Sequence, residues 1–290
     1  MEPAAKIVGR TAVARLLGAG ASAKKAPLLL GMIHLPALPG TPNASLPLSA
    51  ICRRAMSEAT IYAEAELVAR LVKRLNYACM QDGVIVENMH DLPYLRGQVG
   101  PEITSAVAVT VDAVCRRIGQ ARRESMLVGV QILAGANKEA LAVANACGAD
   151  FIRAESLVYG HLADEGWMDA SAGELMRFRR SIGAERVAIF ADIQKKHASH
   201  AVSSDINIGT WARTAEFCLA DGIVVTGTET GSATSLKDVK QAREATQLPV
   251  LVGSGVTPLN LETVAKSGAN ALIVGSHFKK DGHWAEVIEE

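Results

Sequence analysis

The feature that most constrains the fold is a regular alternation of short apolar runs with helical segments. Each run is continuously apolar and rich in β-branched residues, which is typical of a strand buried on both faces of a parallel sheet. These runs occupy residues 28–35, 82–88, 126–133, 150–155, 186–192, 222–227, 248–252 and 270–276. Eight strands separated by helices predict a single (βα)8 TIM barrel. An open doubly wound sheet could carry the same alternation, but the count of eight and the glycine turns after the last two runs favour the barrel.

The chain of 290 residues fits one barrel domain, which we expect to span residues 27–290. Residues 1–26 form an extension with five basic residues against a single acid, Glu2. A mitochondrial transit peptide would leave such a basic segment, but Glu2 and the scarcity of serine favour a short surface helix that covers the base of the barrel. We therefore expect a cytoplasmic protein, with the matrix of mitochondria or another organelle as the alternative.

Charge and hydropathy argue against several classes of protein. Thirty basic and thirty acidic side chains give a formal net charge of zero, so nothing steers the chain toward nucleic acid or an anionic membrane. No run reaches the roughly 18 apolar residues of a membrane-spanning helix. The five cysteines are widely spaced and lack the spacing of a metal site, which predicts reduced thiols in a reducing compartment.

The seventh and eighth runs both end in turns of small residues. Gly253, Ser254 and Gly255 follow one run, and Gly275 and Ser276 follow the other. In a barrel, the loops after the last two strands are where backbone N–H groups usually form a phosphate site. These five residues are therefore the predicted phosphate-binding group, although such glycines could also serve only to shape tight turns.

Two neighbouring segments belong to the same region. We expect a helix over residues 258–267, with Thr257 as its N-cap, Pro258 at its first position and Gly268 after its end. The loop 227–232 after the sixth run is also rich in small residues. Gly227 is therefore a further candidate for the phosphate pocket.

Charged and polar residues lie at the ends of other runs, namely His34, Glu87, Arg153, Glu155 and Asp192. Because strand ends converge on one mouth, the three carboxylates would repel one another unless a proton, Arg153, a lysine or a divalent cation offsets them. One interpretation is a general acid/base pair that abstracts a proton beside a carbonyl. The other is a cation site at Glu87 and Asp192, for which Mg2+ fits better than zinc because histidine is sparse.

Lys196 and His197 follow the fifth run and are candidates for the same mouth. A lysine that forms a Schiff base should be desolvated inside the barrel, whereas Lys196 lies after the strand, which favours a solvated or phosphate-facing lysine. His197 is either a site residue or a loop cap. Arg153 lies in an apolar strand, so we expect it to pair with Glu87 or Glu155, the carboxylates nearest in strand order.

Three runs are preceded by a similar short phrase, Asp82-Gly83, Gly148-Ala149-Asp150 and Asp221-Gly222. The phrase lies between a helix and the following strand, which is the base of a barrel. We expect an architectural role, because barrel chemistry is found at the opposite face.

The phrases Gly31–Gly40, Asp82–Asn88, Gly148–Arg153, Ile189–Asp192 with Lys196-His197, Thr230-Gly231 and Val250–Pro258 occur together in this chain. In this combination the sequence resembles the BtpA/SgcQ family, a group of phosphate-binding barrels of the ribulose-phosphate-binding kind. The resemblance implies the barrel but says little about activity. The family name comes from a role in photosystem I biogenesis, and other members accompany sugar-phosphate utilisation genes.

Two features depart from the family pattern. Ala154-Glu155-Ser156 stands where many bacterial members have a valine-asparagine pair, a change associated with the eukaryotic-like branch, so the photosystem role is not carried over. Few residues follow Trp284 to form an eighth helix. Either a short terminal helix suffices, or a partner subunit of a homo-oligomer covers that side.

Two functional hypotheses follow. The first is a lyase, aldolase or isomerase that acts on a small phosphorylated, sugar-like substrate, with Mg2+ or another divalent cation as a candidate cofactor. The second is an assembly or biogenesis factor that keeps the barrel without catalysis. The enzyme is favoured because a scaffold does not require three carboxylates in one mouth.

Overall fold

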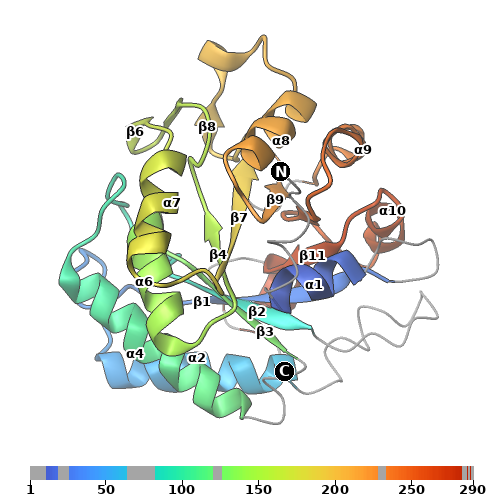
Figure 1. The fold of residues 1–290 in the computed structure, drawn as a ribbon. Coiled ribbons are helices and arrows are strands. Elements are labelled where there is room, and N and C mark those ends of the chain that lie inside the picture. The colour runs from blue at the N-terminus through green and yellow to red at the C-terminus, as the bar shows by residue number, and fades with distance from the viewer. Residues whose placement is uncertain are drawn as a thin grey trace.

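The computed structural model describes residues 11–18, 26–63, 82–119, 126–227, 233–282, 286 and 288. Eight parallel strands in this part of the chain close into a barrel in the order β1-β11-β10-β9-β7-β4-β3-β2 (Figure 1). The strands are β1 (Leu28–His34), β2 (Gly83–Glu87), β3 (Leu127–Gln131), β4 (Phe151–Ala154), β7 (Ala188–Ile193), β9 (Gly222–Val225), β10 (Val250–Val252) and β11 (Ala271–Val274). The predicted TIM barrel is confirmed.

Helices surround the barrel between successive strands (Figure 1). They are α2 (Leu48–Ala63), α4 (Pro101–Ile118), α6 (Asn137–Cys147), α7 (Ala172–Ser181), α8 (Ile208–Phe217), α9 (Leu236–Ala245) and α10 (Leu261–Ala265). The described residues also form the short 3-10 helices η2 (Ala201–Ser203), η3 (Ser276–Phe278) and η4 (Lys280–Gly282). Among the described residues, none of the helices has the length and apolar character needed to cross a membrane.

Helix α10 is shorter than the sequence predicts. It begins at Leu261, and Thr257 is not its N-cap. The side chain of Asn260 accepts the Thr257 N–H at 2.8 Å and donates to the Gly255 carbonyl at 2.7 Å. These two bonds hold residues 257–260 in a turn, so the helix starts only after it.

Strand β7 also begins later than expected, at Ala188 rather than at Arg186. The Arg186 guanidinium donates to the carbonyls of Ala149 and Asn145 at 2.9 and 2.7 Å. Arg186 therefore connects the residues that precede β7 to the end of α6, and it does not form part of the strand.

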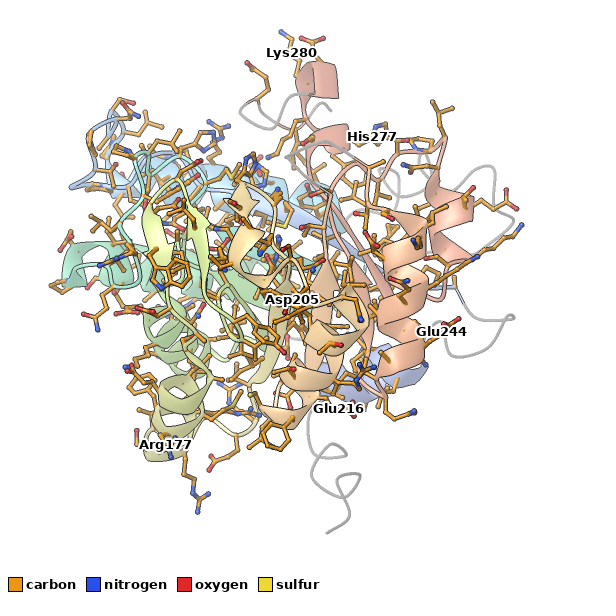
Figure 2. The ribbon with its side chains drawn as sticks, turned by 90° about the horizontal axis from the view of Figure 1, so that it is seen from above. Arg177, Asp205, Glu216, Glu244, His277 and Lys280 are labelled. Carbon is orange, nitrogen blue, oxygen red and sulfur yellow. The ribbon has the colours of Figure 1, made fainter. Side chains whose placement is uncertain are left out.

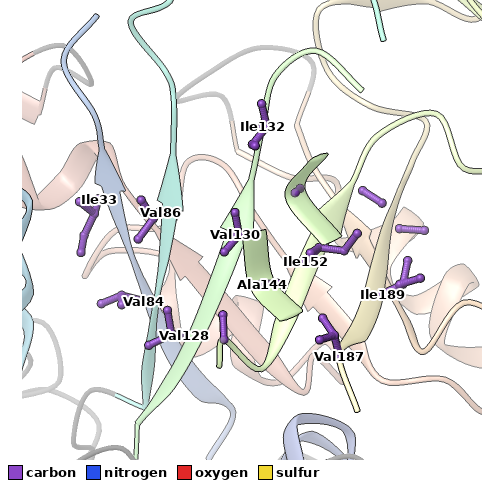
Figure 3. Packing of buried hydrophobic residues seen from close by; sticks show 14 of the residues in the cluster. Ile33, Val84, Val86, Val128, Val130, Ile132, Ala144, Ile152, Val187 and Ile189 are labelled. Atoms are coloured by element: carbon purple, nitrogen blue, oxygen red, sulfur yellow. The ribbon is translucent and has the colours of Figure 1, made fainter. Parts of the chain in front are cut away.

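The strands present apolar side chains on both faces, as their unbroken apolar runs predict. The outward-facing set packs under the helices, and Figure 3 shows Ile33, Val84, Val86, Val128, Val130, Ile152 and Ile189 in this layer. The inward-facing set fills the barrel with Leu30, Met32, Ile85, Leu127, Phe151, Phe190, Val224, Leu251 and Ile273. The rings of Phe151 and Phe190 lie 4.9 Å apart and occupy the space left by Gly129 and Gly222.

Helix α1 (Thr11–Gly18) closes the base of the barrel. Ala12, Val13 and Leu16 are buried and join the cluster inside the barrel, and the Leu16 carbonyl accepts from the Asn270 side chain at 3.1 Å. Residues 1–10 and 19–25 lie outside the described residues. The boundary of the extension at residue 26 and its targeting role stay predictions.

The repeated phrase at the base has the architectural role expected of it. Each aspartate accepts a backbone N–H from a neighbouring strand: Asp82 from Leu29, Asp150 from Val128 and Asp221 from Ile189, at 2.7–2.9 Å. Asn270 accepts from Val250 in the same way at 2.9 Å. These contacts pin the strand starts in register and leave the opposite face for chemistry.

A small antiparallel sheet lies beside the barrel, built largely from the residues between β4 and α7. It consists of β5 (His161–Ala163), β6 (Gly166–Met168) and β8 (Ala198–Ser199), in the order β6-β5-β8. Because β8 follows β7 closely, the sheet joins the excursion after β4 to the segment that carries Lys195 and Lys196. It lies at the mouth of the barrel.

Candidate active site

Side chains alternate in direction along each strand, so every second residue faces the inside of the barrel or its mouth. Leu30, Met32 and His34 lie on one face of β1, and Ile85 and Glu87 on one face of β2; Leu30, Met32 and Ile85 belong to the cluster inside the barrel. The same spacing makes Gln131, Arg153, Asp192 and Thr226 the next inward residues of their strands or strand ends. The polar strand ends predicted from the sequence therefore meet above the apolar filling.

Arg153 and Asp192 form a buried, two-point ion pair. Arg153 Nε and Nη2 donate to the two Asp192 oxygens at 2.8 and 2.9 Å. The predicted partners, Glu87 or Glu155, were wrong because β4 and β7 are hydrogen-bonded neighbours and Arg153 is paired with Phe190, two residues before Asp192. Burial alone would lower the pKa of Arg153, but Asp192, Glu87 and Glu155 together raise it, so its charge is permanent.

Glu155 and Lys195 form a second buried pair, with Lys195 Nζ 3.2 Å from Glu155 Oε1. Asn137 fixes the Glu155 backbone by donating to its carbonyl at 2.7 Å and accepting from its N–H at 3.2 Å. The second carboxylate oxygen of Glu155 and the Gln131 carbonyl oxygen are buried without a hydrogen-bond partner in the described part of the chain. Both residues line a cavity, so both atoms are available to a ligand.

Glu87 is buried, and its Oε2 lies 3.4 Å from His34 Nε2. Burial raises the pKa of Glu87, although Arg153 and Lys196 act against this shift. A carboxyl group that holds its proton to higher pH suits general acid/base chemistry near neutrality. The two neighbouring carboxylates, Glu155 and Asp192, raise the pKa of Glu87 further.

Two cavities open into the mouth and share one wall. The glycine-turn cavity, of about 180 Å³, is lined by Ser254, Gly255, Gly275, Ser276 and His277 among others. The carboxylate cavity, of about 320 Å³, is lined by residues that include Gln131, Glu155, Glu165, Lys195 and His197. The shared wall consists of Glu87, Met89, Arg153 and Lys196, which line both cavities.

The glycine-turn cavity offers unused backbone donors. The N–H groups of Ser254, Gly255, Ser276 and His277 donate to no acceptor among the described residues. Ser254 and Gly255 have φ values of 70° and 62°. Successive backbone N–H groups in a turn can form a concave arrangement that binds anions. Figure 2 shows His277 and Lys280 at the opposite side of the molecule from Glu216 at the end of α8.

Two predicted phosphate residues do not line this cavity. The Gly253 N–H donates to the Val225 carbonyl at 2.9 Å, and the Gly253 carbonyl accepts from the Thr234 hydroxyl at 2.5 Å, so both backbone groups are used. Gly227 lies two residues after the end of β9 and is not among the residues that line either cavity. The rest of its loop, residues 228–232, lies outside the described residues.

The hairpin of β5 and β6 contributes residues that sequence reasoning missed. Glu165 lies in its turn and lines the carboxylate cavity, and one of its carboxylate oxygens is buried without a hydrogen-bond partner in the described ranges. Tyr94, from the loop after β2, lines the same cavity and donates to the Met89 carbonyl at 2.6 Å. Glu165 does not follow a barrel strand, so its position in the sequence did not mark it as a site residue. Only the length of the segment between β4 and α7 could have indicated that this part of the chain reaches the mouth.

A divalent cation does not fit the predicted ligand pair well. Both Asp192 oxygens accept from Arg153, so a cation would have to displace a buried guanidinium. Within the described residues, no group of three or more His, Cys, Asp or Glu side chains is arranged to hold a metal ion. The Mg2+ site stays a prediction.

Comparisons with known proteins agree with this fold. A sequence model of the BtpA family matches residues 24–290. An uncharacterised mitochondrial protein of Caenorhabditis elegans is 46% identical over 283 residues, covering 98% of this chain and 94% of that protein. The photosystem I biogenesis protein BtpA of Synechocystis is 33% identical over 265 residues, covering 90% of this chain and 83% of that protein. A proposed phosphonomutase of Burkholderia cenocepacia superposes with a TM-score of 0.55 at 15% identity, covering 91% of each chain, which shows a shared fold alone.

Proposed function

We propose that this chain, which belongs to the BtpA family, is a lyase, aldolase or isomerase that acts on a small phosphorylated, sugar-like substrate. The observation that carries the proposal is the shared wall between the two cavities. A substrate with its phosphate in the glycine-turn cavity would place its carbon chain against Glu87, Arg153 and Lys196. Such a substrate needs both cavities at once.

The phosphate end is supported by the N–H groups of Ser254, Gly255, Ser276 and His277, which have no acceptor in the part of the chain that the structure describes. Backbone amides are rigid donors that lose little entropy when an anion binds. Gly275 is needed for space, because a Cβ atom there would lie 3.3 Å from Met32 Cγ and 3.6 Å from His34 Cε1. The shape of the cavity therefore depends on the absence of a side chain at Gly275.

The reacting end is supported by two carboxyl groups in different surroundings. Glu87 holds its proton to higher pH, so it is suited to donate a proton to a carbonyl or hydroxyl oxygen. Glu155 is held by Lys195 and has a free carboxylate oxygen, so it is suited to accept a proton from carbon or oxygen. Arg153, fixed by Asp192, supplies positive charge for an enolate or alkoxide that forms between them.

The rival function is assembly without catalysis, because the Synechocystis relative is named for photosystem I biogenesis. That role is stated for the Synechocystis protein and not for this chain. The buried charges favour the enzyme here, since burying Glu87, Glu155 and Arg153 in one mouth is costly for a protein that needs only a scaffold.

The mitochondrial name of the worm relative favours the organelle-matrix alternative for localisation. A carboxyl-terminal fluorescent fusion of the full chain tests this, and diffuse cytosolic fluorescence would contradict it.

The proposed function is tested by thermal unfolding with inorganic phosphate and a panel of phosphosugars, with and without Mg2+. A ligand that binds only the native state stabilises it by about 2.7 kcal/mol at a concentration of 100 times Kd. We expect inorganic phosphate and at least one phosphosugar to raise Tm, and Gly275→Ala to reduce the shift. Gly173→Ala, at an exposed position of α7 with space for the methyl group, is the matched control. Equal Tm values across the panel would favour the assembly factor.

A further inference from the structure

Lys196 lies where the two cavities meet. It lines both of them, together with Glu87, Met89 and Arg153. Among these four shared side chains, the amine of Lys196 is the group that condenses with a carbonyl carbon. A carbonyl compound bound across both cavities therefore passes this amine.

The backbone around Lys196 is unusual. Gln194 and His197 have φ values of 47° and 54°, so two non-glycine residues in the left-handed region flank the lysine pair. Residues in this region are strained, and they cluster at functional sites. The Lys196 N–H donates to Thr226 Oγ1 at 3.2 Å, which ties this turn to the end of β9. The strained turn brings both lysines to the cavities although they follow the strand.

The two adjacent lysines have opposite electrostatics. Burial alone would lower the pKa of Lys195, but Glu155 and Glu165 raise it. Burial lowers the pKa of Lys196, and the neighbouring Arg153 lowers it further, although Glu87 and Asp192 act against this. Lys195 is thus a permanent cation, whereas Lys196 has more of the neutral amine that a nucleophile requires.

We infer that Lys196 forms an imine with the carbonyl carbon of a phosphorylated aldehyde or ketone whose phosphate occupies the glycine-turn cavity. The inference rests on the proposed function and narrows its substrate class to phosphorylated carbonyl compounds. It also changes the role expected from the sequence, in which Lys196 was a solvated or phosphate-facing lysine.

The chemical step balances with groups at the site. The neutral amine of Lys196 adds to the carbonyl carbon, the C=O electron pair moves to oxygen, and a proton passes from nitrogen to that oxygen. Glu87 then gives a second proton to the same oxygen, which leaves as water while the nitrogen lone pair forms the C=N+ bond. The resulting cationic imine withdraws electrons from the adjacent carbon, and the free oxygen of Glu155 is placed to take a proton from it.

The experiment is reductive trapping of the wild-type protein at pH 7 with glycolaldehyde phosphate or glyceraldehyde 3-phosphate and sodium cyanoborohydride. Reduction converts an imine into a stable secondary amine, which peptide mapping by mass spectrometry assigns to one lysine. We expect labelling of Lys196 clearly above that of Lys195, because the pKa of Lys196 is lowered whereas that of Lys195 is raised. Unphosphorylated glycolaldehyde should label Lys196 much less, and added inorganic phosphate should protect it.

The outcomes separate this inference from the proposed function. Lys196→Arg should remove the label, whereas Lys195→Arg should retain it. If inorganic phosphate raises Tm but neither phosphorylated aldehyde labels Lys196 above the other lysines, the imine is wrong and a phosphate-ester enzyme remains. If phosphate neither raises Tm nor protects any lysine, both proposals fail.

Discussion

Arg153 donates to both carboxylate oxygens of Asp192, at 2.8 and 2.9 Å, across the neighbouring strands β4 and β7. Both side chains are buried at the level where the apolar filling of the barrel ends. The pair thus fixes a permanent cation in the wall shared by the two cavities. Its geometry explains why three carboxylates can occupy one mouth.

Asp192→Asn should destabilise the protein strongly. The substitution leaves the buried Arg153 without its charge partner, which typically costs about 3–5 kcal/mol. Urea unfolding should show a lower midpoint with an unchanged slope. The double variant Arg153→Met with Asp192→Leu should recover most of the stability but bind no phosphosugar. An Asp192→Asn protein as stable as the wild type would show that the pair contributes little.

Glu87→Gln should change stability in a pH-dependent way. Because burial raises the pKa of Glu87 above its ordinary value of 4.5, the folded state holds this proton to higher pH than the unfolded state. The contribution of Glu87 is therefore complete below pH 4.5 and is lost as pH rises through the folded pKa. Relative to the wild type, the variant should gain stability over that rise, while turnover of an identified substrate is lost. A pH-independent difference in unfolding free energy would contradict the shift.

Lys279→Met should destabilise the carboxyl-terminal side of the phosphate cavity. Lys279 Nζ donates to Glu58 Oε2 of helix α2 at 2.8 Å, and both side chains are buried. Lys279 directly follows η3, which contains Ser276 and His277, so the pair anchors two of the cavity's amides. We expect a loss of about 3–5 kcal/mol in unfolding free energy and weaker phosphate binding. Lys280→Met, next in the chain and exposed, is the control and should change neither.

Asp150→Ala should affect stability without affecting the site. The Asp150 side chain accepts the Val128 N–H at 2.7 Å at the base of the barrel, far from the mouth. A hydrogen bond to a charged group is typically worth about 1.5–3 kcal/mol. Asp150→Asn keeps an acceptor and should lose less. Chemical denaturation measures the loss, and unchanged phosphate affinity in the folded variant confirms that the base is architectural.

The barrel was predictable because its signals are local. Continuous apolar runs, glycine-terminated helices and the repeated Asp phrase each specify a strand or its start from a few neighbouring residues. Inward positions at strand ends, such as Glu87 and Asp192, follow from the period of two. The start of helix α10 was mispredicted because the Asn260 side chain hydrogen-bonds within residues 255–260 and holds them in a turn, so the helix does not begin at Pro258.

The pairings within the mouth were not predictable in the same way. The partner of Arg153 depends on the register between β4 and β7, which sequence order alone does not give. The strained turn at Gln194 and His197 places Lys195 and Lys196 in different surroundings, although they are adjacent in sequence. Glu165 reaches the site on a hairpin held by β8, a contact between segments more than thirty residues apart.

The proposed function requires one phosphorylated substrate to occupy both cavities across their shared wall. The most direct measurement is a crystal structure of the protein with glyceraldehyde 3-phosphate. We expect density for the phosphate within hydrogen-bond distance of the N–H groups of Gly255 and Ser276, and for the carbon chain beside Glu87 and Lys196. Phosphate density at another surface, with both cavities holding only water at saturating ligand, would contradict it.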